Sequence, residues 1–136
     1  MKTLINPKNF THTMGAYSHG VKVDIGDCEM IFTTGEIAMD KDGKPVAPDD
    51  IEKQTVYVFE SLKTILEEAG SSLDDVVKAI IYVTRMEDFA KISPIRNKYF
   101  ANSKPVSTLV EINKTAKDGC DVEIEVIAVR KKPATK

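Results

Sequence analysis

Cysteine, histidine and excess positive charge are all scarce in this chain. Its 136 residues include two cysteines and two histidines, and its formal net charge at pH 7 is −2. Cys28 and Cys120 lie far apart and form no CxxC pattern, which fits reduced thiols in a cytoplasmic protein. The spacing of the cysteines and histidines also matches no zinc signature. The sequence therefore predicts free thiols and no zinc site.

Basic clusters and long apolar runs are missing as well. The one basic run, at residues 130–132, leads into a predicted water-exposed tail over residues 131–136, so nucleic acid is not an expected partner. No segment is long and apolar enough to span a membrane, and the first residues lack the apolar stretch of a secretory signal. We therefore expect a cytoplasmic protein with one domain over residues 1–130, because this length allows one core.

Alternation of apolar and polar residues is strongest near the C-terminus. Residues 107–113 and 121–129 read STLVEIN and DVEIEVIAV, a two-residue period that is typical of strands with one face in a core. The opposite phase of the last strand carries Glu123 and Glu125. Such carboxylates lie either on a solvated face or in a cleft at a subunit boundary, and for Glu125 the solvated face is the simpler interpretation.

A β-hairpin is predicted upstream. Residues 21–25 alternate, Gly26 and Asp27 supply a turn, and residues 30–32 resume the strand. Gly35 follows this second strand, and a glycine there indicates a bulge or a close backbone approach.

The clearest helix signal begins after residue 48. Asp49 can cap the helix, and Glu52 can reach back as in a capping box. Apolar side chains then recur at three- and four-residue spacing from Ile51 to Ala69, and Gly70 supplies a stop.

Two more elements complete the predicted fold. Residues 76–83 are apolar on both phases, which predicts a central strand covered on both faces. Ser93 and Pro94 form a natural cap and first-turn proline for a second helix that runs to about residue 101. The order of elements predicts an α+β fold, with one sheet and both helices on one of its faces. The other face would be too apolar for water, so we expect association.

Several short motifs occur in a characteristic order and spacing. They are GAYSHG at 15–20, FTTGEI at 32–37, QT at 54–55, LK at 62–63, EAGSSLDDVVK at 68–78, DFA at 88–90, KP at 104–105 and VEIEVIA at 122–128. In this order the chain resembles the RidA (YjgF) family, also labelled endoribonuclease L-PSP, over about residues 17–130.

The resemblance implies both an assembly and an activity. The fold would be chorismate-mutase-like, and three subunits would pack their sheets into a barrel-like core with a cleft at each boundary. Members of the best-known subgroup hydrolyse the imine or enamine of a small 2-oxo acid to ammonia and the keto acid, without a metal or an organic cofactor. The implied partners are a small carboxylate ligand and two further copies of the chain.

The family pattern can be transferred position by position. The glutamate that orients water falls at Glu123, the tyrosine that lines the cleft at Tyr17, and the backbone groups that contact the ligand at Thr34 and Gly35. Two of these residues have a plain alternative: Glu123 could lie on a solvated strand face, and Tyr17 could be a packed aromatic with a hydrogen-bonded hydroxyl.

The chain departs from the pattern at its ligand anchor. The family's carboxylate-binding arginine is replaced by Ser107, and a serine cannot form a charge-assisted bidentate clamp. Ser107, Thr108 and Leu109 are nonetheless expected to line the ligand site, with the two hydroxyls as hydrogen-bonding groups.

The second helix departs from the pattern too. A pocket asparagine of the family falls at Ser93, and Arg96 replaces a frequent tyrosine. Arg96 could supply the missing cation, although an exposed arginine on a helix surface is the simpler interpretation. His19 is interpreted as a turn or rim residue and not as a general base, and Cys120 as an unactivated thiol.

Three functions remain open after these departures. The first is an imine or enamine deaminase with an altered substrate anchor. The second is a non-catalytic trimer that binds metabolites or partner proteins. The third is an endoribonuclease, which the acidic composition and the absence of a basic, aromatic-lined groove disfavour.

Overall fold

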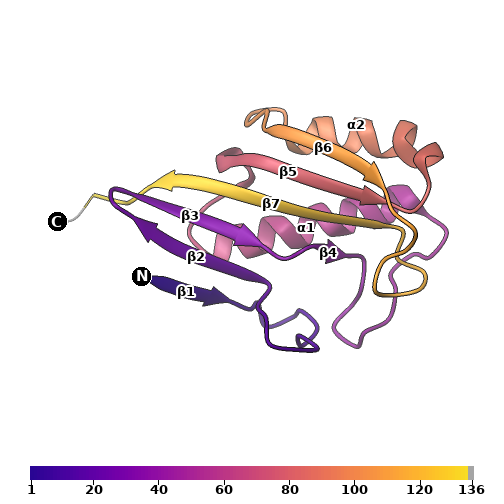
Figure 1. The fold of residues 1–136 in the computed structure, drawn as a ribbon, viewed down its shortest axis with the longest axis horizontal. Coiled ribbons are helices and arrows are strands. Elements are labelled where there is room, and N and C mark those ends of the chain that lie inside the picture. Colours follow the sequence, from indigo (N-terminus) through magenta and orange to yellow (C-terminus); the bar gives the residue numbers. More distant parts are fainter. Residues whose placement is uncertain (135–136) are drawn as a thin grey trace.

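A mixed β-sheet with two helices on one face makes up the computed structural model, which describes residues 1–134 (Figure 1). The strands are β1 Lys2–Ile5, β2 Gly20–Ile25, β3 Cys28–Thr33, β4 Glu36–Ile37, β5 Val76–Val83, β6 Val106–Glu111 and β7 Val122–Lys131. The helices are α1 Ile51–Glu68 and α2 Phe89–Tyr99. The predicted α+β class and the placement of both helices are confirmed.

The last strand, β7, lies at the centre of the sheet. The strand order is β1-β2-β3-β7-β5-β6, and the short strand β4 also pairs with β7, beyond the end of β3. All neighbouring pairs are antiparallel except β5 and β6, which α2 connects. Because β4 pairs with residues 123 and 124 of β7, the segment that follows the hairpin is held beside Glu123.

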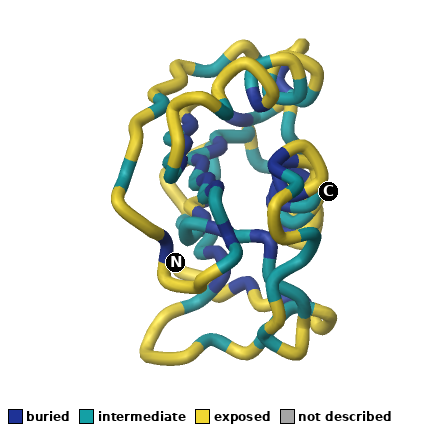
Figure 2. Tube along the Cα trace, turned by 90° about the vertical axis from the view of Figure 1, so that its right-hand side faces the viewer, coloured by how far each residue is buried: buried dark blue, intermediate teal, exposed yellow. Residues whose placement is uncertain are grey.

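The core lies between the sheet and α1. One face of α1 packs its apolar side chains against the inward residues of β3, β5 and β7, and the buried stretches gather in the interior of the molecule (Figure 2). Phe59 of α1 stacks on Tyr99 of α2 with ring centroids 4.7 Å apart. The predicted apolar stripe of α1 is therefore the face that supports the sheet.

The ends of α1 confirm one expectation and correct another. Gly70 adopts a φ of +84°, its N–H donates to the Glu67 carbonyl, and the Ser71 N–H donates to the Leu66 carbonyl, which is a Schellman stop. The cap, however, is Asp50, whose side chain accepts the Lys53 N–H at 3.1 Å. The prediction of Asp49 was wrong, because Asp49 adopts a φ of +69° in the preceding turn.

The second helix begins earlier than its proline indicates. α2 starts at Phe89, after a 3-10 turn at Met86–Asp88, and Pro94 lies inside it. Ile92, in the first turn of this helix, is wholly buried. The predicted start at Ser93 and Pro94 was therefore wrong by one turn.

The outer face of the sheet is open in the single chain. Strand β5 was expected to be covered on both faces, but only its helix-facing side is buried, and Val77 is 47% exposed.

The basic run at residues 130–132 also differs from the predicted tail. Arg130 and Lys131 belong to β7, and Arg130 Nε lies 3.3 Å from Glu29 Oε1. Residues 135–136 of the predicted tail lie outside the described residues.

Within residues 1–134, no helix combines the length and the apolar character that a membrane span requires.

Candidate functional site

A cavity of about 820 Å³ opens between the N-terminal segment, α1 and the strand ends. Its walls come from residues 9–19, the link between β3 and β4, α1, and the loop before β7. It includes four of the predicted site residues: Tyr17, Thr34, Gly35 and Glu123. The structure thus brings together residues that are up to 106 positions apart in the chain (123 − 17).

Glu123 and Gly35 are in direct contact. Ile37 of β4 pairs with Glu123 of β7, so the strand pairing draws Gly35 across the Glu123 side chain. A Cβ at Gly35 would lie 2.8 Å from the Glu123 Cδ atom, which is too close for any real side chain. The close approach predicted for Gly35 is confirmed, and its purpose is to leave room for the Glu123 carboxylate.

The Glu123 carboxyl group is half-buried and has two other carboxylates near it. Burial raises its pKa above the ordinary value, and the neighbouring Glu125 and Glu36 carboxylates raise it further. Glu125 lies on the same strand face and accepts a hydrogen bond of 2.7 Å from the Tyr82 hydroxyl. A carboxylate with a raised pKa is a better proton acceptor than an ordinary one, so Glu123 is suited to acid–base chemistry.

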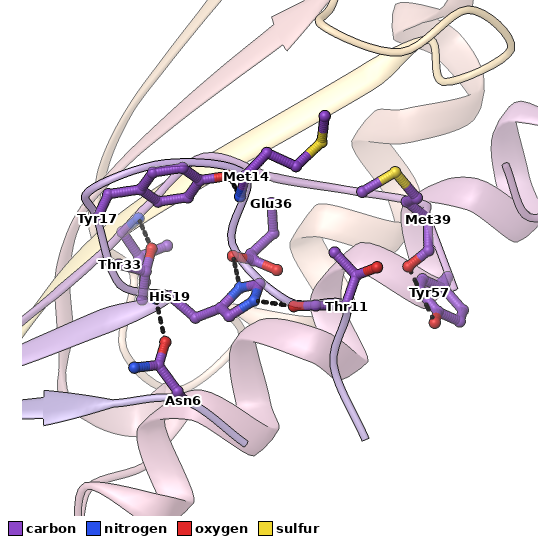
Figure 3. A network of polar contacts seen from close by, with 10 residues as sticks. Asn6, Thr11, Met14, Tyr17, His19, Thr33, Glu36, Met39 and Tyr57 are labelled. Carbon is purple, nitrogen blue, oxygen red and sulfur yellow. Dashed lines mark hydrogen bonds and ion pairs between the residues drawn. The ribbon is translucent and has the colours of Figure 1, made fainter. Parts of the chain in front are cut away.

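Tyr17 forms part of the cavity rim. Its side chain is 52% exposed, and its hydroxyl accepts the Met14 N–H at 3.3 Å, which bends the segment back on itself (Figure 3). The hydroxyl is therefore partly engaged, and the exposed ring is free to contact a ligand.

His19 is buried beneath this segment. Its ring contacts Glu36 and the Thr11 carbonyl, and its own carbonyl oxygen accepts the Thr34 N–H at 2.9 Å. His19 lies in a bend directly before β2, as expected, and it lines the cavity. It is not an exposed rim residue, because its side chain is 11% exposed and is paired on both sides. The Thr34 N–H is used within the fold, which makes Gly35 the better backbone position for a ligand contact.

The remaining strand residues lie away from Glu123 within one chain. The register aligns Ser107 with Ala79 and Val126, on the helix-facing side of the sheet, whereas Glu123 aligns with Tyr82 and faces the opposite side. Ser107 lies two strands away from Glu123 across the sheet and three residues away along the strand direction. These offsets place the two Cα atoms about 14 Å apart. Leu109 packs on the core, and Thr108 shares a row with Glu125.

Arg96 and Ser93 are also remote from the cavity in the single chain. Arg96 Nη2 donates to Ser93 Oγ at 3.0 Å, and its guanidinium carbon lies 5.9 Å from the centre of the Phe89 ring. These contacts hold Arg96 against its own helix. Any contact of Ser93, Arg96 or Ser107 with the cavity would have to come from another copy of the chain.

Sequence reasoning missed several cavity residues of chemical interest, among them Glu36, Tyr57 and Lys117. Glu36 lies inside the FTTGEI motif, so its position beside Gly35 was a usable signal. Tyr57 donates its hydroxyl hydrogen to the Met39 carbonyl at 3.3 Å. Lys117 comes from a loop without periodicity, and only the folded chain places it at the cavity.

Cys120 is not part of this site. It is buried, its thiol donates to the Ala38 carbonyl, and burial raises its pKa above the ordinary value. The interpretation of an unactivated thiol agrees with these contacts.

Comparison with known proteins places this geometry in a family. The family model described as endoribonuclease L-PSP matches residues 8–130. A RutC family protein of Pyrococcus abyssi is 38% identical over 129 residues, which are 95% of this chain and 98% of that protein. TdcF of Escherichia coli, a candidate reactive intermediate deaminase, is 32% identical over 96% of this chain and 98% of its own.

Solved structures give the same result. The crystal structure of yeast Mmf1 superimposes with a TM-score of 0.85 at 30% identity and covers 96% of this chain and 100% of Mmf1. The crystal structure of Escherichia coli TdcF with bound serine has a TM-score of 0.80 at 31% identity, with 95% and 99% of the two chains covered. On motifs, fold and overall similarity, the chain belongs to the RidA (YjgF) family, described by its family model as endoribonuclease L-PSP.

Proposed function

We propose that this protein is a deaminase-type hydrolase that releases ammonia from the imine or enamine of a small 2-oxo acid or a related small metabolite. The observation that carries the proposal is the half-buried Glu123 carboxylate, held against Gly35 in a cavity with Tyr17 at its rim. The relatives support a reaction of this class, because TdcF is a candidate reactive intermediate deaminase and its structure holds serine.

The proposed reaction needs one acid–base group and one water molecule. The substrate enters as the protonated imine. The Glu123 carboxylate takes a proton from the water as its oxygen attacks the imine carbon, which forms a neutral tetrahedral carbinolamine. Glu123 then returns that proton to the nitrogen, and it removes the hydroxyl proton as the C–N bond breaks, so that ammonia leaves and the carbonyl forms. The proton left on Glu123 passes to the released ammonia, which gives ammonium and restores the carboxylate. The raised pKa of Glu123 suits these steps, because proton transfer is most effective when the pKa lies near the working pH.

The ligand's carboxylate needs a cation, and Ser107 cannot provide one. Lys117 is the lysine that this chain itself contributes to the cavity wall. Arg96, in contrast, is held against Ser93 and Phe89 of its own helix. We therefore assign Lys117 as the first candidate anchor and Arg96 of a neighbouring copy as the second.

A homotrimer is part of the proposal. The outer sheet face of one chain exposes apolar side chains, among them Phe32, Val106 and Val110. Covering this face with two further copies would bury these side chains, and it would bring a second chain's residues to the boundary of the cavity.

Ammonia release from freshly generated 2-iminobutanoate tests the proposal. Wild-type protein is expected to release ammonia, and Glu123→Gln is expected to reduce the rate by about 10²- to 10⁴-fold, which is the usual effect of removing a general acid–base group. Glu125→Gln is the matched comparison, since it changes the same residue type on the same strand face but outside the cavity wall. It affects Glu123 only through charge, so it should reduce the rate by much less. Equal losses in both variants would contradict a specific role for Glu123.

Substitutions of the cations then separate the two anchors. Lys117→Gln is expected to raise KM for an imino acid, whereas Lys114→Gln in the same loop, outside the cavity wall, should leave KM unchanged. Ser107→Arg tests the family arrangement. Turnover only after this substitution would mean that the natural ligand lacks the carboxylate, and inactivity of both proteins would favour a non-catalytic binding protein.

A further inference from the structure

The His19 imidazole lies between oxygen atoms on both of its nitrogens. Its Nδ1 is 2.9 Å from Glu36 Oε2, and its Nε2 is 2.9 Å from the Thr11 carbonyl oxygen (Figure 3). A carbonyl oxygen only accepts, so Nε2 carries a hydrogen. The approach of Nδ1 to a carboxylate oxygen at 2.9 Å requires a hydrogen between the two atoms, and histidine holds a proton more tightly than glutamate in ordinary surroundings, so we assign this hydrogen to Nδ1. The ring is then an imidazolium, and its contact with Glu36 is an ion pair.

The surroundings support this assignment. His19 and Glu36 are 8% and 6% exposed, so an uncompensated charge on either residue would be costly. The Phe10 ring meets His19 edge-on, with centroids 5.0 Å apart, and closes that side of the pair. The hydrogen bond to Glu36 raises the pKa of His19 above 6.5, against the opposing effect of burial, and the Thr11 carbonyl adds to the rise.

The pair is connected to the candidate site through the backbone. The His19 carbonyl accepts the Thr34 N–H at 2.9 Å, and the His19 N–H donates to Asn6 Oδ1 at 3.0 Å. Glu36 follows Gly35 directly and is close enough to raise the pKa of Glu123 by charge repulsion. The charge state of His19 therefore affects how much negative charge Glu123 experiences.

We propose that His19 is a positioning residue of the cavity: its imidazolium cancels the charge of Glu36 and fastens the Thr11 end of the N-terminal segment to β4. The negative charge that Glu36 presents to Glu123 is thereby reduced. The use of Glu123 in catalysis rests on the proposed function, whereas the cancellation of charge does not.

Other titratable side chains line the same cavity as the pair, and they come from each element around it. They are His12 and Tyr17 of the N-terminal segment, Tyr57 and Glu60 of α1, Lys117 of the loop before β7, and Glu123 of β7. Within residues 1–134, only Glu36 and Thr11 are hydrogen-bonded to the His19 ring. Thr11 makes its contact through a backbone carbonyl, so Glu36 is the side chain to substitute when the charge of His19 is tested.

NMR of the intact protein measures the charge without any turnover. The ¹⁵N shifts of the His19 ring are expected to show both nitrogens protonated, with the ring more than half protonated at pH 6.5. In Glu36→Gln the pKa of His19 should fall. A ring less than half protonated at pH 6.5, or an unchanged pKa in Glu36→Gln, would overturn the proposal.

A set of three variants separates charge cancellation from a merely structural role. In His19→Gln, the Glu36 carboxylate has no counter-charge, so the pKa of Glu123, followed by ¹³C NMR of its carboxyl carbon, should rise. In Glu36→Gln and in the double variant that charge is gone, and no such rise is expected. A similar shift in all three variants would indicate loosened packing and would overturn the proposal.

The outcomes also separate this inference from the proposed function. If His19→Gln does not fold, the wild-type and Glu36→Gln titrations still decide the charge of His19. If wild-type protein hydrolyses no imine, the proposed function fails, while the titrations still decide whether His19 cancels the charge of Glu36.

Discussion

The Glu123 carboxyl group occupies the space that any side chain at position 35 would need, since a Cβ on Gly35 would come within 2.8 Å of the Glu123 Cδ atom. Strand pairing between β4 and β7 fixes this contact. Glycine is required at position 35 for close approach, and the two residues act as one unit of the cavity wall.

Gly35→Ala is expected to displace the Glu123 side chain. The new methyl group would overpack the contact and reduce the free energy of unfolding by about 1–3 kcal/mol. The rate of imine hydrolysis should fall by more than the loss of folded protein accounts for. Gly15→Ala is the control, because its Cβ would meet the Tyr17 ring at an ordinary 3.7 Å. Thermal melts and ammonia release measure both effects. Unchanged activity in Gly35→Ala would contradict the assigned contact.

Glu123→Gln is expected to stabilise the protein at neutral pH. The pKa of Glu123 is higher in the folded chain than the ordinary 4.5, so ionisation is less favourable in the folded state. The free energy of unfolding should therefore fall as the pH rises from about 4.5 through the folded-state pKa. Glutamine does not ionise and avoids this loss.

Urea denaturation at about pH 4 and about pH 7 checks this prediction. The stability advantage of Glu123→Gln should be present at neutral pH and shrink in acid. An advantage that is the same at both pH values would mean that the pKa of Glu123 is not raised.

Gln54→Leu is expected to destabilise the fold without touching the site. The Gln54 amide is 1% exposed and donates to the carbonyls of Val46 and Gly119, while its oxygen accepts the Asp121 N–H at 3.0 Å. Leaving these buried groups unsatisfied should cost about 2–4 kcal/mol in urea denaturation. Lys53→Leu, on the exposed side of the same helix, should change stability by about 0.5 kcal/mol at most.

Val110→Glu is expected to disrupt the proposed trimer. Val110 is 39% exposed on the open sheet face, and a carboxylate buried there between subunits would lack a partner. Val56→Glu is the matched control, because Val56 is 40% exposed on α1. Sedimentation should give three times the chain mass for wild type and Val56→Glu, and a lower mass for Val110→Glu. A wild-type mass of one chain would contradict the trimer.

Local patterns in the sequence account for most of the fold. Alternation at residues 121–129 and the Gly26 turn predicted their strands, and Gly70 ended α1 where expected. These signals are reliable because each depends on neighbouring residues and the periods of strand and helix. Both helix starts were misplaced, since an aspartate next to the true cap and a proline inside α2 resemble start signals.

Some features of the candidate site could likewise be predicted from the sequence, and others could not. By itself the sequence determined the family, through the order of its motifs, and with it the roles expected of Glu123, Gly35 and Tyr17. Only the tertiary structure decided that His19 is buried against Glu36 and that Lys117 reaches the cavity. The physical reason is that burial and ion pairing depend on residues brought together from distant strands, loops and helices, which no local period encodes.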